Sequence, residues 1–96
     1  MQATLTRDAH FDSLDIWSYV ARRQLDSADR LAEKFEATFE LLARNPRLGR
    51  GADWLRPGMR RLPIEGFIVF YTPCDDGVQI IRVLHGSRNF VPELFE

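Results

Sequence analysis

The feature that most constrains the fold of this chain is a change of hydrophobic period near its middle. In residues 28–42 the apolar side chains recur three and four positions apart, which is the spacing of one face of an α-helix. Beyond residue 58 the mostly apolar segments 67–72 (FIVFYT) and 78–84 (VQIIRVL) are separated by turn-forming residues, and this pattern is typical of β-strands. The chain is therefore expected to combine a helical first half with a sheet-forming second half in an α+β fold.

The helical half is predicted to be a hairpin. A first helix begins at Arg7, with Thr6 as its N-cap. Its apolar face is formed by Leu14, Trp17, Val20 and Ala21. A second helix begins at Asp26 or Ser27 and ends before Pro46, because the residue preceding a proline is disfavoured in the α region. Two amphipathic helices joined by a few residues are expected to pack antiparallel.

The second half is predicted to form a three-stranded meander. A loop over residues 47–58 is followed by strands at 59–64, 67–72 and 78–84. With a short strand at 3–5, the order is β-α-α-β-β-β. In this arrangement the N-terminal strand and the helical hairpin pack on one face of the C-terminal antiparallel meander. The other face is expected to stay partly open and to carry the functional surface.

Length and charge narrow the class of protein. A chain of 96 residues is expected to form a single domain spanning 1–96. Its formal net charge of −1 argues against general affinity for nucleic acid. Residues 1–43 hold five basic and eight acidic side chains, which is a net −3. Residues 44–61 hold six arginines against Asp53, which is a net +5, and arginine suits bidentate contacts with carboxylates or phosphates.

Other features exclude several kinds of site. Cys74 is the only cysteine, so no internal disulfide is expected, and nothing beside it would activate a thiolate. His10 and His85 lack neighbouring ligands, so neither a metal nor a cofactor is expected. No signal-peptide pattern is visible, and no apolar run approaches the roughly 20 residues needed to cross a bilayer. A cytoplasmic location is therefore expected.

Four segments of the chain resemble the ParE/RelE superfamily of toxins. Residues 12–23 (DSLDIWSYVARR) are similar to the first helix of the family. Residues 39–50 (FELLARNPRLGR) resemble the link from the second helix to the sheet, and 55–71 (LRPGMRRLPIEGFIVFY) resemble the first two long strands. Residues 80–89 (IIRVLHGSRN) resemble the closing strand. The match covers nearly the whole chain in the right order and favours the ParE branch with its RelE/ParE-like fold.

The resemblance implies the toxin component of a type II toxin–antitoxin system. ParE-like members inhibit DNA gyrase, and a cognate antitoxin neutralises them, often a ParD-like protein with a ribbon-helix-helix DNA-binding domain. Contact with DNA is then expected only through the antitoxin, within a toxin–antitoxin hetero-oligomer and without a membrane partner. Two alternatives are a RelE-like ribosome-dependent mRNA endoribonuclease and a non-toxic module that binds the antitoxin for regulation.

The nuclease alternative depends on a small set of residues. Cleavage of RNA needs a proton-transfer group and cations near the charged transition state. If the chain is a nuclease, Arg82, His85 and Arg88 are the candidate catalytic residues. However, residues 66–68 read Gly-Phe-Ile where RelE-like nucleases place an arginine, and no tyrosine or histidine follows Arg88. Inhibition by binding is therefore favoured over catalysis, and His85 is interpreted as structural.

The predicted partner-binding residues are Trp54, Arg56, Arg60, Arg61, Arg82 and Arg88. Arg82 lies in an apolar strand, on the face of Ile80 and Leu84 by simple alternation. It must pair with an acid or reach the open face, because burying an unpaired guanidinium is costly. Trp54 is either a plug over the sheet or a contact residue, since interface anchors are enriched in tryptophan and arginine.

The three arginines of 56–61 have two readings, a solvated surface or a docking site for the acidic tail of the antitoxin or for the target. The remaining large side chains are assigned to the core. These are Trp17, Tyr19, Phe35, Phe39 and Tyr71, the last with its hydroxyl at the rim.

Overall fold

The structure is a computed structural model that describes every residue from Met1 to Glu96. Its elements are β1 (Gln2–Leu5), α1 (Arg7–Ala21), α2 (Leu25–Arg44), β2 (Arg50–Gly51), β3 (Arg60–Ile64), β4 (Phe67–Cys74), β5 (Gly77–His85) and the 3₁₀ helix η1 (Pro92–Phe95). The α+β class and the order of helices and long strands are confirmed. The short β2 lies in the segment predicted as a loop, and η1 was not predicted. No helix combines the length and apolarity needed to cross a membrane.

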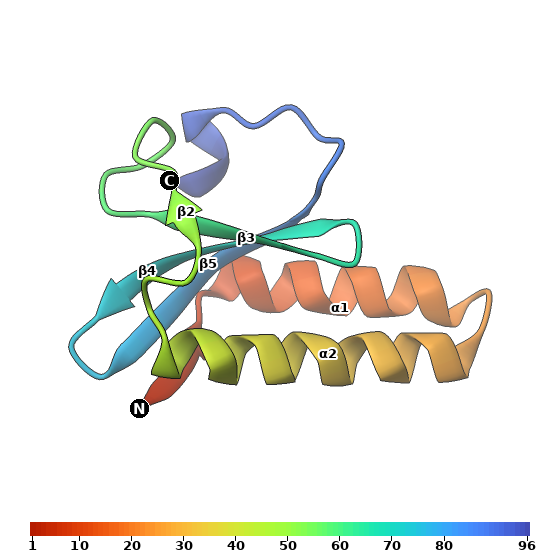
Figure 1. The fold of residues 1–96 in the computed structure, drawn as a ribbon. Helices are drawn as coiled ribbons and strands as arrows, with labels where there is room; N and C mark the ends of the chain where they lie inside the picture. Colours follow the sequence, from red (N-terminus) through yellow and green to blue (C-terminus); the bar gives the residue numbers. More distant parts are fainter.

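The strands form one mixed sheet in the order β1-β5-β4-β3-β2. β3, β4 and β5 make the predicted antiparallel meander. β1 lies within the sheet as an edge strand, not over its face, and pairs parallel with β5 from Gln2 opposite Gly77 to Leu5 opposite Ile80. A Cβ at Gly77 would overlap the carbonyl oxygen of Gln2, so the glycine lets β1 approach β5. Both helices lie side by side across one face of this sheet (Figure 1).

Thr6 joins β1 to α1, as its predicted N-cap role requires. Its Oγ1 accepts a hydrogen bond from the N–H of Ala9 (3.1 Å) and donates one to the carbonyl of Ile81 (2.7 Å). One hydroxyl therefore satisfies a free amide of the helix and a carbonyl of β5 beyond the end of β1.

The first hydrophobic core lies between the helices and the sheet. Its buried members are Ala9, Phe35, Phe39, Leu42, Ala43, Val69, Tyr71, Val78, Ile80 and Val83. The predicted burial of Phe35, Phe39 and Tyr71 is confirmed. Trp17 and Tyr19 were also predicted to be core residues, but they are 37% and 56% exposed. Ala9 and Ile16 mark the side of α1 that faces this core, and Trp17 and Tyr19 lie on its two flanks.

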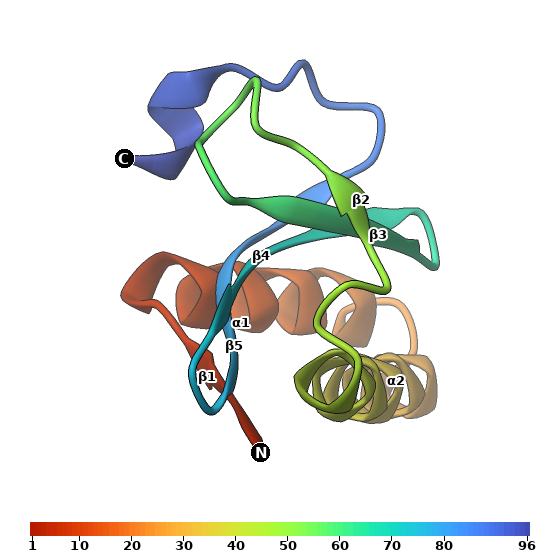
Figure 2. The ribbon, with the colours of Figure 1, turned by 60° about the vertical axis from the view of Figure 1, so that its left-hand side comes forward.

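A second core covers the opposite face of the sheet, so the prediction of a partly open face is wrong. Its members are Ala52, Leu55, Met59, Ile68, Phe70, Ile81, Leu84 and Phe95. They come from β4, β5, the loop between β2 and β3, and the C-terminal segment, which crosses above the sheet in Figure 2. The ring of Phe70 meets those of Phe90 and Phe95 at centroid distances of 5.1 and 4.7 Å. β4 is apolar on both faces, and a strand of that kind needs a cover on each side.

A β-bulge in β5 changes the face on which Arg82 lies. The register steps from Phe70 opposite Arg82 to Tyr71 opposite Ile80, which leaves Ile81 without a partner. Arg82 therefore shares its face with Leu84, whereas Ile80 lies on the helix-covered face. The predicted grouping of Arg82 with Ile80 is wrong because simple alternation does not count the extra residue.

Candidate interaction surfaces

The predicted partner-binding residues do not form one continuous surface. Arg60 and Arg61 are consecutive in β3 and pair with Tyr71 and Phe70, so their side chains leave opposite faces of the sheet. Arg60 Nη1 donates to the carbonyl of Gly49 at 2.5 Å. Arg61 makes no side-chain hydrogen bond and lies opposite Arg50 of β2, on the face of the second core. The two arginines therefore cannot contact a flat partner together.

Arg82 is held in an ion pair with Asp12 of α1. Its Nε donates to Oδ2 at 2.7 Å and its Nη2 to Oδ1 at 2.8 Å, while Nη1 donates to the carbonyl of Leu94 at 2.9 Å. The two side chains are only 18% and 12% exposed. The hydrogen bonds that the Arg82 guanidinium donates to the Asp12 carboxylate raise its pKa. Of the two alternatives for Arg82, pairing with an acid is therefore the one that the structure adopts.

Trp54 and Arg56 lie in the loop between β2 and β3. The neighbours Ala52 and Leu55 point into the second core, whereas the Trp54 side chain is 63% exposed. Trp54 is therefore not a plug over the sheet, and its large apolar ring faces solvent. Arg56 Nη1 donates to the carbonyl of Phe95 at 3.0 Å and ties this loop to the C-terminal segment.

The three candidate nuclease residues do not come together in the structure. His85 lies on the face opposite Arg82, with its ring 5.4 Å from that of Phe67 and its Nδ1 2.8 Å from Ser87 Oγ. Arg88 is exposed and has no side-chain partner within the chain. The structure thus does not bring Arg82, His85 and Arg88 together around one reacting atom.

Tyr71 of β4 holds the turn that follows α2 by two hydrogen bonds of its hydroxyl. Its hydroxyl donates to the carbonyl of Pro46 (2.8 Å) and accepts from the N–H of Gly49 (2.8 Å). The side chain is fully buried, so its hydroxyl is not at the rim as predicted. Burial raises the pKa of the Tyr71 hydroxyl, against smaller opposing effects of the Gly49 hydrogen bond and the Arg60 charge. The turn between these bonds carries the exposed side chains of Arg47 and Leu48.

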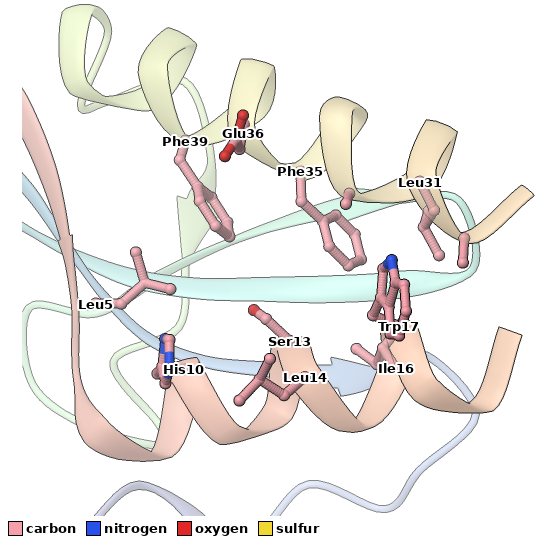
Figure 3. Close-up of a pocket in the computed structure, with 12 residues that line it drawn as sticks. Leu5, His10, Ser13, Leu14, Ile16, Trp17, Leu31, Phe35, Glu36 and Phe39 are labelled. Carbon is pink, nitrogen blue, oxygen red and sulfur yellow. The ribbon is translucent and has the colours of Figure 1, made fainter. Parts of the chain in front are cut away.

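An apolar groove of about 280 Å³ lies between α1 and α2, and sequence reasoning did not identify it. Side chains from both helices point into it (Figure 3). Its lining residues are Leu5, His10, Ser13, Leu14, Ile16, Trp17, Ala28, Leu31, Ala32, Phe35, Glu36 and Phe39. Leu14 is 49% exposed, and the Trp17 indole N–H donates to Asp29 Oδ1 (3.1 Å) at its edge. The apolar periodicity of the two helices is consistent with such a groove, but the same periodicity is also typical of helix faces that are buried in a core.

The fold and these surfaces define a small α+β protein that presents an apolar helical groove on one side and an exposed tryptophan in a basic segment on the other. The family model described as the ParE toxin of the type II toxin–antitoxin system parDE matches residues 3–90. The chain belongs to this ParE toxin family and is the toxin component of a type II toxin–antitoxin system.

Several known proteins are similar to this chain. Toxin ParE1 of Caulobacter vibrioides is 40% identical over 86 residues, which cover 88% of each chain. Toxin ParE1 of Mycobacterium tuberculosis is 33% identical over 80% of this chain and 79% of its own length. A solved chain from the chromosomal ParDE system of P. aeruginosa shares the fold, with a TM-score of 0.72 at 24% identity over 88% of this chain and 95% of its own.

Proposed function

We propose that this toxin inhibits DNA gyrase by binding it in the cytoplasm, and that a ParD-like antitoxin with a ribbon-helix-helix DNA-binding domain neutralises it. The choice of gyrase comes from the resemblance of the sequence to the ParE branch. The observation that carries the binding mode is the presence of two separate exposed surfaces of different chemistry. A toxin that must meet a target and an inhibitor needs such surfaces.

The apolar groove between α1 and α2 is the proposed site for the antitoxin. Leu14 and Trp17 expose large apolar areas along it, while Phe35 and Phe39 form part of its lining. Apolar grooves of this kind fit the apolar face of an amphipathic helix, whose anchors recur three and four residues apart. The antitoxin is therefore proposed to place such a helix between α1 and α2.

The basic segment is the proposed contact for gyrase. Trp54 exposes most of its ring, and residues 44–61 carry a net charge of +5. Leu48 in the same segment is 50% exposed. Tryptophan and arginine dominate the energetics of many protein interfaces, whereas an exposed tryptophan adds little to the stability of a free domain. The groove lies over the helix layer and Trp54 over the second core, so the two partners meet different sides of the sheet.

Binding rather than RNA cleavage is proposed because the strongest nuclease candidate is already engaged. The Arg82 guanidinium already donates hydrogen bonds to Asp12 and to the carbonyl of Leu94. His85, the only remaining acid–base candidate of that set, lies on the other face of β5. Ribosome-dependent RNA cleavage is therefore the alternative that the assays described next would detect.

A supercoiling assay with purified gyrase, run beside an in vitro translation assay, tests the proposal. The toxin is expected to inhibit gyrase, and the antitoxin encoded beside it is expected to restore supercoiling when added in equal amount. Translation of a reporter mRNA should continue with its mRNA intact. Cleavage of ribosome-bound mRNA with no effect on gyrase would overturn the proposal, and unimpaired growth of cells expressing the toxin alone would favour a regulatory module.

A further inference from the structure

The turn over residues 45–49, between α2 and β2, is held in place by side chains from the sheet. The Tyr71 hydroxyl donates to the carbonyl of Pro46 and accepts from the N–H of Gly49, at 2.8 Å each. Arg60 Nη1 donates to the carbonyl of Gly49. Backbone groups on both sides of the two residues at the tip of the turn therefore have fixed partners.

Gly49 brings this turn close against the sheet. The residue is buried, and a Cβ at this position would lie 2.6 Å from the carbonyl oxygen of Arg61 and 2.7 Å from the Tyr71 hydroxyl. Any side chain at position 49 would therefore push the turn away from β3 and β4. A buried tyrosine hydroxyl and a glycine thus fix the backbone of a segment whose tip lies in solvent.

The tip of the turn carries two side chains that the rest of the chain leaves free. Arg47 is exposed and its guanidinium makes no hydrogen bond or ion pair, while Leu48 is 50% exposed. Asn45, Pro46, Arg47 and Leu48 line a shallow hollow of about 460 Å³. A loop whose backbone is already ordered loses less conformational entropy when a partner binds it. The turn therefore has the properties of a preorganised contact.

Two arginines that follow the turn lack acidic partners. Arg50 of β2 lies directly opposite Arg61 of β3, so both side chains leave the same face of the sheet. Like charges in this arrangement destabilise a sheet. Asp53 is the only acid in residues 44–61, and its Oδ1 accepts the N–H of Gly58 (2.9 Å). No ion pair within the chain relieves the repulsion, so an anionic partner is favoured here.

We propose that the turn at Arg47 and Leu48 is a preorganised recognition loop for an acidic surface of gyrase, and that Tyr71 is its positioning residue. This inference rests on the proposed function and specifies which part of the basic segment meets the target. Leu48 supplies an apolar anchor, and the unpaired arginines around it fit carboxylates through paired hydrogen bonds. The exposed leucine favours a protein over DNA, because polar and cationic groups make the contacts with a DNA backbone.

The affinity of purified gyrase for the immobilised toxin measures the contribution of the loop. Leu48→Ala and Arg47→Glu should each raise the dissociation constant for gyrase at least about tenfold. Leu25→Ala and Arg30→Glu are the matched controls, because both residues are exposed near the opposite end of α2, and they should keep wild-type affinity. Salt should weaken gyrase binding by the wild type more than by Arg47→Glu. Antitoxin affinity should stay unchanged in all four variants.

A double-variant cycle tests whether Tyr71 acts through the turn. Tyr71→Phe removes both hydrogen bonds of the hydroxyl, so gyrase affinity should fall about three- to tenfold while antitoxin affinity is kept. The double variant Tyr71→Phe, Leu48→Ala should lose little more than Leu48→Ala alone, because both changes act on one contact. Tyr19→Phe, whose exposed hydroxyl binds only Arg23, should leave gyrase affinity unchanged. Full additivity, or unchanged affinity of the folded Tyr71→Phe variant, would overturn the positioning role.

The outcomes separate this inference from the proposed function. Wild-type affinity for gyrase in both Leu48→Ala and Arg47→Glu would overturn the recognition loop and leave gyrase inhibition standing. A wild-type toxin that does not bind gyrase would overturn both. Loss of antitoxin affinity with gyrase affinity kept would assign the turn to the antitoxin. Binding of a short DNA duplex to the toxin alone, lost in Arg47→Glu, would assign the arginines to nucleic acid, and either of these last two results would overturn the inference.

Discussion

Arg82 of β5 and Asp12 of α1 form a two-pronged ion pair at the point where β1 ends, with donor–acceptor distances of 2.7 and 2.8 Å. Asp12 Oδ2 also accepts a hydrogen bond from the backbone N–H of Val83 at 3.0 Å. This carboxylate oxygen stands in for the backbone carbonyl that a longer β1 would offer to Val83. Through its third bond, to the carbonyl of Leu94, Arg82 reaches the C-terminal segment. One pair of side chains thus connects the first helix, the sheet and the cover of the second core.

Removing one member of this pair is expected to cost more than removing both. Asp12→Asn should lower the free energy of unfolding by about 3 kcal/mol, because it leaves a mostly buried guanidinium without a counter-charge. The double variant Asp12→Leu, Arg82→Met should lose less than the single variant, since no charge remains. Urea unfolding of the two variants and the wild type measures the difference. Equal losses in both variants would contradict the account.

Tyr71→Phe is expected to destabilise the fold in a pH-dependent way. Below pH 10 the loss should be about 1–3 kcal/mol, because the N–H of Gly49 and the carbonyl of Pro46 lose their partner. The folded state raises the pKa of Tyr71, so the unfolded chain releases this proton first and wild-type stability falls as the pH rises above about 10. The variant lacks this loss, so the two stability curves should converge at alkaline pH.

Urea unfolding at pH 7 and at several values above pH 9 tests the effect of Tyr71. Tyr19→Phe is the matched control, because its hydroxyl is exposed and binds only Arg23. That variant should follow the wild-type curve throughout. A constant gap between wild type and Tyr71→Phe at all pH values would show that ionisation of Tyr71 plays no part.

Leu14→Asp is expected to weaken antitoxin binding while leaving the toxin folded. The side chain is 49% exposed in the free toxin but would be covered by a helix in the groove, where a carboxylate is costly to bury. The dissociation constant should rise at least about tenfold, corresponding to 1.4 kcal/mol. Leu41→Asp provides the control, since Leu41 is 46% exposed on α2 and outside the groove. Calorimetric titration that finds the same loss for both variants would rule out a specific groove contact.

Trp54→Ala is expected to weaken inhibition of gyrase without weakening antitoxin binding. Inhibition of gyrase should need at least about tenfold more toxin, because exposed tryptophans are typical anchors of interfaces. Antitoxin affinity and thermal stability should stay at wild-type values, since the side chain is 63% exposed and Trp54 is not a member of the second core. Phe11→Ala removes an aromatic ring that is 50% exposed on α1 and serves as the control. Wild-type inhibition by the Trp54 variant would remove this residue from the target surface.

The positions of most elements follow from local physical chemistry and were predictable. Thr6 caps α1 because its hydroxyl reaches an amide three residues ahead, and Pro46 stops α2 by its effect on the residue before it. The strand runs stand out because their apolar residues leave no helical period. β2 was missed because its two residues, Arg50 and Gly51, are too few to carry a pattern of their own.

The functional surfaces depend on contacts that no local pattern contains. Asp12 and Arg82 lie 70 positions apart, and their pairing exists only because α1 crosses the edge of β5 beyond the end of β1. The second face was expected to be open because Leu55 and Phe95, which help to close it, lie in a loop and a short 3₁₀ helix that carry no helical or strand period. Leu14 and Trp17 have the helical spacing expected of core residues. They are nevertheless exposed, because α1 and α2 pack side by side on the sheet and leave a groove between them. Periodicity therefore sets which side chains are grouped, while packing between distant segments sets which of those groups is buried and which can bind a partner.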